Sequence, residues 1–188
     1  MVVQLIRNKL LQSASYILGE YIVDCGDCEA IISAIGDKDL KGIFLTHCHH
    51  DHVYGLDKLL DFYPQAKVYC TQKTYQGLKD PLINLSYINP EYPFSFSHDN
   101  NVVLLNEGKF CIDSIMNVDV ILSAGHSGDS VSYIIGDSIF TGDAHIPFAK
   151  VFAKWPTSCA NLAEKSERKL LEIIRHKHLE VYPGHWKN

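Results

Sequence analysis

Residues 44–56 read FLTHCHHDHVYGL and place four histidines and one aspartate within six positions, directly after an apolar run. His47 and His49 are two residues apart at the end of a predicted strand, so both rings can point toward one cation. Asp51 and His52 begin the next turn and can face a second cation. Imidazole and carboxylate at this density suit zinc, with iron or manganese as alternatives.

The spacing His-x-His-x-Asp-His is too specific to be explained as a surface loop that contains several histidines by chance. With 10 histidines among 188 residues, a chance match is expected on the order of one time in several hundred. Three further predicted strands also end in a ligand-type residue: His126 follows VDVILSAG, Asp143 follows SIFTG and His185 follows LEVYPG. Because strand ends on one edge of a sheet converge, these side chains are expected to meet the histidine cluster.

Apolar periodicity and turn residues divide the chain into alternating strands and helices. A hairpin is predicted at 15–26, around Gly19 and Glu20. Further strands are predicted at 41–47, 67–70, 101–106, 118–124, 131–136, 138–142 and 179–183, and helices at 29–35, 54–62, 71–78 and 161–176. Mixed strands in both halves, with helices between them, predict an α+β protein of two packed sheets with helices outside.

Composition narrows the class of protein. A chain of 188 residues with 46% hydrophobic and 21% charged residues is predicted to form a single domain, residues 1–188, that is soluble and globular. The net charge of -5 offers no basic field for nucleic acid, so no nucleic-acid partner is expected. No apolar run approaches the about 20 residues of a membrane span, and charged residues interrupt the N-terminal stretch, so no signal peptide is expected.

The six cysteines are scattered, which indicates a reducing compartment and predicts a cytoplasmic protein. Cys25 and Cys28 have the spacing of a redox pair, but no thioredoxin-like context follows them. We therefore expect them to be small buried hydrophobic residues.

Five motifs, in order, carry a resemblance to a known family: IVDCG, which contains Asp24, then THCHHDH, AGHSGDS, IFTGD and YPGH. The sequence resembles the metallo-β-lactamase superfamily and, within it, the small glyoxalase II-like hydrolases. The resemblance implies a four-layer αββα sandwich with the metal site at one edge between the two β-sheets. This agrees with the architecture predicted from periodicity.

The resemblance also implies a ligand set and a reaction. It assigns one metal to His47, His49 and His126. It assigns a second metal to Asp51, His52 and His185. It makes Asp143 the bridge between the metals, whereas Asp24 orients a ligand without binding metal. The implied cofactor is zinc, two ions per chain, and a metal-bound hydroxide would attack a thioester, ester or lactone, with Asp51, Asp143 and His185 as the catalytic residues.

Departures from the family pattern define the alternatives. The turn after His126 reads Ser-Gly-Asp-Ser in place of Thr-Pro-Gly-Ser, which adds the charge of Asp129 near the site. The chain ends three residues after His185, whereas glyoxalase II enzymes continue into a helical domain that binds glutathione. A smaller thioester or ester is therefore the expected substrate. Two alternatives stay open: a mononuclear iron persulfide dioxygenase-like enzyme, and a catalytically silent metal- or partner-binding domain.

Other residues have plainer expected roles. Cys48 and His50 occupy variable positions of the motif and are expected to pack or to meet solvent. His145 is either a pocket residue or a surface residue. The aromatic residues of 81–96 and 144–155, among them Phe148 and Trp155, form either an apolar wall for a small-molecule substrate or a cover over the sheet edge.

Overall fold

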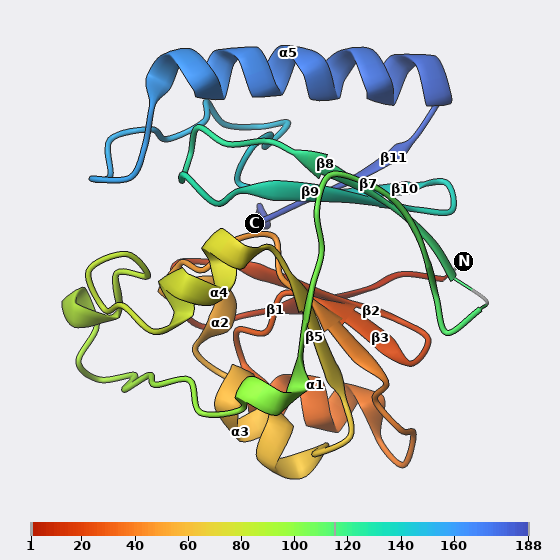
Figure 1. The fold of residues 1–188 in the computed structure, drawn as a ribbon, viewed down its shortest axis with the longest axis vertical. Helices are drawn as coiled ribbons and strands as arrows, with labels where there is room; N and C mark the ends of the chain where they lie inside the picture. Colours follow the sequence, from red (N-terminus) through yellow and green to blue (C-terminus); the bar gives the residue numbers. More distant parts are fainter. Residues whose placement is uncertain (1, 115, 188) are drawn as a thin grey trace.

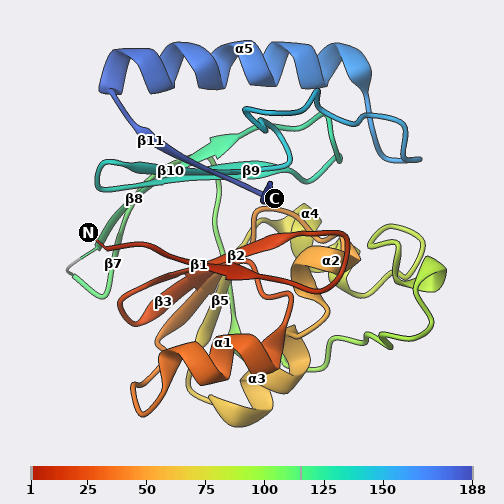
Figure 2. The same ribbon diagram turned by 180° about the vertical axis from the view of Figure 1, so that it is seen from behind.

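Two β-sheets face each other, with helices on their outer surfaces (Figures 1 and 2). The computed structural model describes residues 2–114 and 116–187. The first sheet has the strand order β1-β2-β3-β4-β5-β6 and the second the order β11-β10-β9-β8-β7. Helices α1 and α3 cover the first sheet and α5 covers the second, which confirms the predicted four-layer αββα sandwich.

The first half of the chain builds the first sheet. Its strands are β1 (Gln4–Arg7), β2 (Ala14–Leu18), β3 (Tyr21–Val23), β4 (Gly42–Phe44), β5 (Lys67–Cys70) and β6 (Val102–Leu104). Its helices are α1 (Cys28–Ile35), α2 (His50–Val53), α3 (Leu56–Phe62) and α4 (Gln72–Leu78), followed by the 3-10 turns η1 (Ser86–Ile88) and η2 (Asp99–Asn101).

The second half builds the second sheet. Its strands are β7 (Gly108–Ile112), β8 (Met116–Leu122), β9 (Val131–Ile135), β10 (Ser138–Gly142) and β11 (Glu180–Pro183), and its helix is α5 (Ala160–Lys177). Among the described residues, no helix combines the length and the apolar character that crossing a membrane requires.

Parallel pairing determines where the loops meet. Strands β3, β4, β5 and β6 run parallel to one another, and β10 runs parallel to β11. The carboxyl ends of parallel strands lie at the same edge, so the residues after β3 and β4 emerge side by side. The residues after β10 and β11 do the same in the second sheet.

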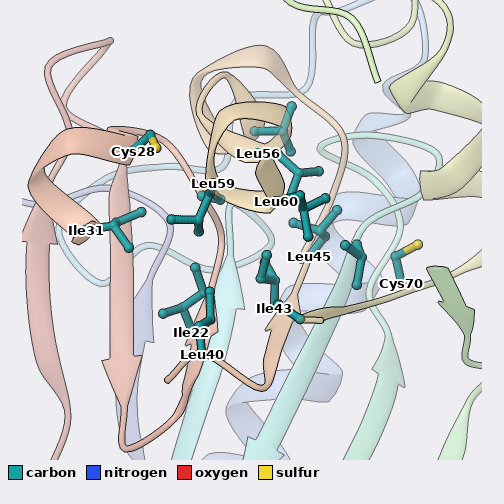
Figure 3. Close-up of a cluster of buried hydrophobic side chains, with 14 of the residues drawn as sticks. Ile22, Cys28, Ile31, Leu40, Ile43, Leu45, Leu56, Leu59, Leu60 and Cys70 are labelled. Carbon is teal, nitrogen blue, oxygen red and sulfur yellow. The ribbon is translucent and has the colours of Figure 1, made fainter. Parts of the chain in front are cut away.

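Alternation along each strand divides the core into layers. On β4, Ile43 packs with α1 and α3, where Leu56, Leu59 and other apolar residues gather (Figure 3). The next residue, Phe44, points the opposite way, stacks on Tyr69 at 4.8 Å between ring centroids and belongs to the layer between the sheets. Burial on both faces explains why residues 42–45 read as a continuous apolar run.

Apart from the two 3-10 turns, three elements were not predicted from the sequence, namely two strands and one short helix, and each lacks an apolar period. Strands β1 and β7 lie at the outer ends of their sheets, and most of their residues are exposed or half-buried. Helix α2 reads HDHV, so its buried face consists mainly of ionisable side chains. The remaining predicted elements are present with small shifts of their ends, and the hairpin turns at Gly19, whose φ is 66°.

Candidate metal centre

The predicted ligand residues converge at one edge of the sandwich, although they come from widely separated parts of the chain. The loop after β4 carries His47 and His49, and helix α2 carries Asp51 and His52. The loops after β8, β10 and β11 carry the remaining three, His126, Asp143 and His185. Figures 1 and 2 show the C-terminal end of β11 beside the loop that leads into α2. The structure therefore places all seven predicted residues in one cluster.

The first group consists of His47, His49 and His126, all buried. The ring nitrogens His49 Nδ1 and His126 Nε2 face each other at 2.9 Å. The Nδ1 atom of His126 donates to the backbone carbonyl of Phe152 at 2.7 Å. That hydrogen bond fixes the ring and leaves Nε2 directed into the group, as metal-binding histidines require.

The second group consists of Asp51, His52 and His185. The Oδ2 atom of Asp51 lies 3.5 Å from His52 Nε2 and 3.6 Å from His185 Nε2. His185 Nδ1 donates to the carbonyl of Leu11 at 2.9 Å, and His52 Nδ1 donates to Asp24 Oδ2 at 2.9 Å. Both imidazoles are thus anchored through Nδ1 and present Nε2 to the same carboxylate.

Asp143 lies between the two groups. Its Oδ2 atom is 3.3 Å from Nε2 of His126 in the first group and 3.1 Å from Nε2 of His185 in the second. Its Oδ1 atom is 3.4 Å from His52 Nε2. Gly184 makes this position accessible, because a Cβ atom there would lie 2.1 Å from Asp143 Oδ1 and 2.8 Å from the carbonyl carbon of Gly142.

Asp24 supports both groups from behind. Its carboxylate accepts from the Thr46 hydroxyl at 2.7 Å and from His52 Nδ1. The Thr46 oxygen then accepts from His47 Nδ1 at 3.0 Å. One buried carboxylate therefore orients a histidine of each group. The bonds from the Thr46 hydroxyl and from His52 end on Oδ2, and Oδ1 accepts from the backbone N–H of Thr46 at 2.8 Å, so both oxygens have partners, which agrees with the predicted supporting role.

Asp129 joins the two halves of the site. Its Oδ2 atom accepts from the backbone N–H of Cys48 at 2.8 Å, so the turn that carries His126 is tied to the peptide between His47 and His49. The sequence indicated only an added charge near the site. The structure gives that charge a partner that lies 81 positions earlier in the chain.

Burial and neighbouring charges divide the histidines into two electrostatic classes. Burial, together with neighbouring imidazoles, lowers the pKa of His47 well below its usual value and lowers the pKa of His49 to about 3. Burial also opposes charge on His52 and His185, but adjacent carboxylates, Asp143 foremost for His185, raise the pKa of both. His47 and His49 of the first group are thus neutral imidazoles, the form that binds metal.

The donor set fits divalent cations. Within the described part of the chain, His47 Nε2, His52 Nε2 and Asp143 Oδ1 are buried and have no hydrogen-bond partner. Such atoms are costly unless a ligand satisfies them. The separations of 3.5 and 3.6 Å from Asp51 Oδ2 to the second group's histidine nitrogens also fit, since a tetrahedral zinc ion with bonds of about 2.0–2.2 Å holds neighbouring ligand atoms about 3.3–3.6 Å apart.

A pocket of about 220 Å³ opens onto the cluster. Apart from the proposed ligands, it is lined by Leu11, His50, Leu85, Ile88, Asn89, Phe152 and Trp155. The apolar-wall hypothesis therefore applies to Trp155, whereas Phe148 is not among the lining residues and is 43% exposed. A larger hollow beside Tyr63 and Tyr69 lies at the opposite end of the first sheet and includes no histidine.

The structure gives the surroundings of His50 and His145, two histidines that were not assigned as ligands. His50 is buried and packs against Tyr54 and Phe94, as expected, but it also lines the pocket, which the motif gave no reason to expect. His145 is buried and is not among the pocket-lining residues, and its Nδ1 donates to Glu167 of α5 at 3.0 Å.

The cysteine pair follows the plainer expectation. Cys25 and Cys28 are buried and not joined by a disulfide. Burial raises the pKa of Cys25 well above its usual value and that of Cys28 to about 11. Because the thiolate is the reactive form, these thiols are poorly suited to redox exchange.

A four-layer αββα sandwich that gathers five histidines and two aspartates at one edge defines a metal-dependent, hydrolase-type enzyme fold. The model of the metallo-beta-lactamase superfamily matches residues 9–185, and the chain belongs to this superfamily. The family resemblance of the sequence is thereby confirmed.

Two curated relatives and one solved structure illustrate the similarity. A hydroxyacylglutathione hydrolase of Shewanella halifaxensis is 30% identical over 129 residues, 66% of this chain and 42% of the relative. The probable polyketide biosynthesis zinc-dependent hydrolase BaeB of Bacillus velezensis is 27% identical over 154 residues, 79% of this chain and 58% of the relative. The chain thus spans about half the length of these relatives.

The crystal structure of the B3 metallo-beta-lactamase BLEG-1 superposes with a TM-score of 0.82 at 26% identity, covering 99% of this chain and 92% of that one. The whole architecture, including the edge that carries the cluster, is therefore shared with a solved member of the superfamily.

Proposed function

We propose that the protein is a hydrolase with a binuclear zinc site that cleaves a thioester, ester or lactone. The observation that carries this proposal is the position of Asp143, whose Oδ2 atom lies within 3.3 Å of a histidine nitrogen from each group. A carboxylate shared in this way suits two cations held close together. The relatives support the assignment, since one is a hydroxyacylglutathione hydrolase and another a zinc-dependent hydrolase.

His47, His49 and His126 would hold one zinc ion, Asp51, His52 and His185 the other, and Asp143 both. When bound, the pair would supply Lewis acidity and a water that ionises near neutral pH.

The chain's own residues perform the remaining tasks. Asp51 lines the pocket, so its carboxylate can accept a hydrogen bond from the attacking water and hold its orientation. Asp143 neutralises positive charge at the centre of the site. His126 and His185 are fixed by backbone carbonyls through their Nδ1 atoms, which keeps both rings in position during turnover.

The test is metal analysis followed by a hydrolysis screen. The protein is expressed without a histidine tag in medium that contains zinc, iron and manganese at equal concentrations. We expect about two metal ions per chain, mostly zinc, because seven ligands exceed the four that one closed zinc site uses. Chelation should abolish ester and thioester hydrolysis, and added zinc should restore it.

Two outcomes would contradict the proposal. One iron per chain with negligible zinc would favour the dioxygenase-like alternative. Two zinc ions without hydrolysis of any thioester, ester or lactone would favour the silent binding domain.

A further inference from the structure

The pocket wall beyond the ligand cluster is assembled from three separate segments. Leu11 comes from the β1–β2 turn, Ile88 and its neighbours come from η1, and Phe152 and Trp155 come from the loop before α5. The rings of Phe152 and Trp155 lie 5.4 Å apart, and Trp155 reaches to 6.4 Å from His49. A substrate held at the cluster must therefore lie against this wall.

The wall is apolar and carries no permanent charge. Leu11, Ile88 and Phe152 are 59%, 41% and 49% exposed and gather around one pocket, as exposed apolar residues do at a ligand-binding patch. Among the described lining residues there is neither lysine nor arginine, and the polar side chains outside the proposed ligands are only Asn89 and His50. An anionic group placed against this wall would lose water without gaining a cationic partner.

Resting on the proposed function, we infer that the substrate carries uncharged, apolar groups on both sides of its reacting carbonyl. The bound cations would lie at the carbonyl itself, so they cannot compensate a carboxylate farther along either group. Glutathione thioesters, whose peptide carries carboxylates, are thereby disfavoured. The pocket volume of about 220 Å³ is below the about 300–1,000 Å³ of drug-sized ligand sites, so the groups are small.

The reaction consumes one water per turnover. The water oxygen bonds to the acyl carbon, the carbon–sulfur or carbon–oxygen ester bond breaks, and the leaving atom takes a proton to give a thiol or alcohol beside a carboxylic acid. No oxidant or second substrate is required.

Matched thioesters test the inference. S-Hexanoyl-N-acetylcysteamine and S-hexanoylglutathione share the acyl group and differ in the charge and the size of the thiol. S-Adipoyl-N-acetylcysteamine adds a carboxylate at the far end of the acyl group. For the zinc-loaded enzyme we expect kcat/KM at least about tenfold higher for the neutral thioester than for either anionic one. Equal or faster hydrolysis of an anionic thioester overturns the inference but not the proposed function.

A binding experiment covers the case in which no thioester is hydrolysed. The ketone 2-octanone and the anion 7-oxooctanoate share a carbon skeleton and differ by a terminal carboxylate. In a Trp186→Phe variant, Trp155 is the remaining tryptophan of the chain's two, and its fluorescence reports the pocket in the metal-free protein. We expect about tenfold tighter binding of the ketone; equal affinities refute the uncharged-wall inference directly.

A charge-gain variant provides a third test. Asn89→Lys places an ammonium group in the wall at a half-buried position. Tyr87→Lys adds the same charge at a residue that is 55% exposed and not in the lining. We expect Asn89→Lys to raise the ratio of kcat/KM for S-adipoyl over S-hexanoyl thioester about tenfold, and Tyr87→Lys to change it less than about twofold. The same ratio in both variants contradicts the inference.

Discussion

Asp24 and His52 are joined by a hydrogen bond of 2.9 Å from the ring Nδ1 atom to the carboxylate Oδ2 atom. The same oxygen accepts from Thr46, whose hydroxyl contacts His47. One residue, predicted to support the ligands without binding metal, therefore orients a histidine from each group. Asp143, in contrast, faces nitrogen atoms of both groups directly.

This difference predicts different responses to zinc. Asp143→Ala removes the shared ligand, so we expect loss of at least one metal ion and near-complete loss of turnover. Asp24→Asn keeps the shape and one acceptor, and the loss of a supporting group typically costs about 10–100-fold in affinity or activity. Metal content and turnover at saturating zinc measure both effects. Excess zinc should partly rescue Asp24→Asn and fail to rescue Asp143→Ala; full rescue of both would show that Asp143 is not the bridge.

Gly184→Ala should damage the site through crowding alone. The added methyl group would lie 2.1 Å from Asp143 Oδ1 and 2.8 Å from the carbonyl carbon of Gly142. Overpacking of this kind costs about 1–3 kcal/mol, and here it also displaces a proposed ligand. We expect a lower zinc content and a lower melting temperature. Gly128→Ala is the matched control, because its nearest atom would be Thr157 O at 3.6 Å; similar zinc loss in both variants would argue against crowding as the cause.

Asp129→Ala should remove the hydrogen bond that ties the turn after His126 to the loop after β4. It leaves the buried N–H of Cys48 without its acceptor, which costs about 1–3 kcal/mol. Asp129→Asn retains an acceptor oxygen and should lose less. Urea unfolding of the metal-free proteins gives the free energies, and zinc titration shows whether affinity falls as well. If Asn and Ala variants unfold alike, the hydrogen bond to Cys48 contributes little to stability.

The low pKa of His49 predicts an acid-sensitive metal-free protein. Its folded pKa of about 3 lies below the usual 6.5, so between these values the unfolded chain binds a proton that the folded chain does not. Stability contributed by this group is therefore full above pH 6.5 and is lost as pH falls toward 3. One such group contributes a slope of up to about 1.4 kcal/mol per pH unit.

The raised pKa values of His52 and His185 do not add to this slope below pH 6.5, because both residues are then protonated in folded and unfolded chains alike. The measurement is the free energy of unfolding of chelated protein at pH 6.0 and 5.0, for wild type and His49→Gln. We expect the wild type to lose more stability over this interval. An equal loss in both proteins would show that His49 is not the residue responsible.

Much of the site was predictable from the sequence because its first part is local. His47, His49, Asp51 and His52 lie on one strand exit and one helical turn, where the backbone alone sets their directions. The other ligands were found because each follows an apolar run that ends at the same edge, and family resemblance supplied their grouping. Strands β1 and β7 escaped prediction because edge strands bury too few side chains to show a period.

Packing between the sheets determines the rest, since no local pattern encodes which distant segments come into contact. The hydrogen bond from Cys48 to Asp129 joins residues 81 positions apart. The pocket wall combines Leu11, Ile88 and Trp155, three apolar residues whose sequence neighbourhoods resemble those of ordinary surface loops. Short sequence motifs thus identify the candidate ligand residues. The charge and shape of the space that a substrate would occupy depend instead on contacts between distant segments, which the burial of apolar side chains brings together.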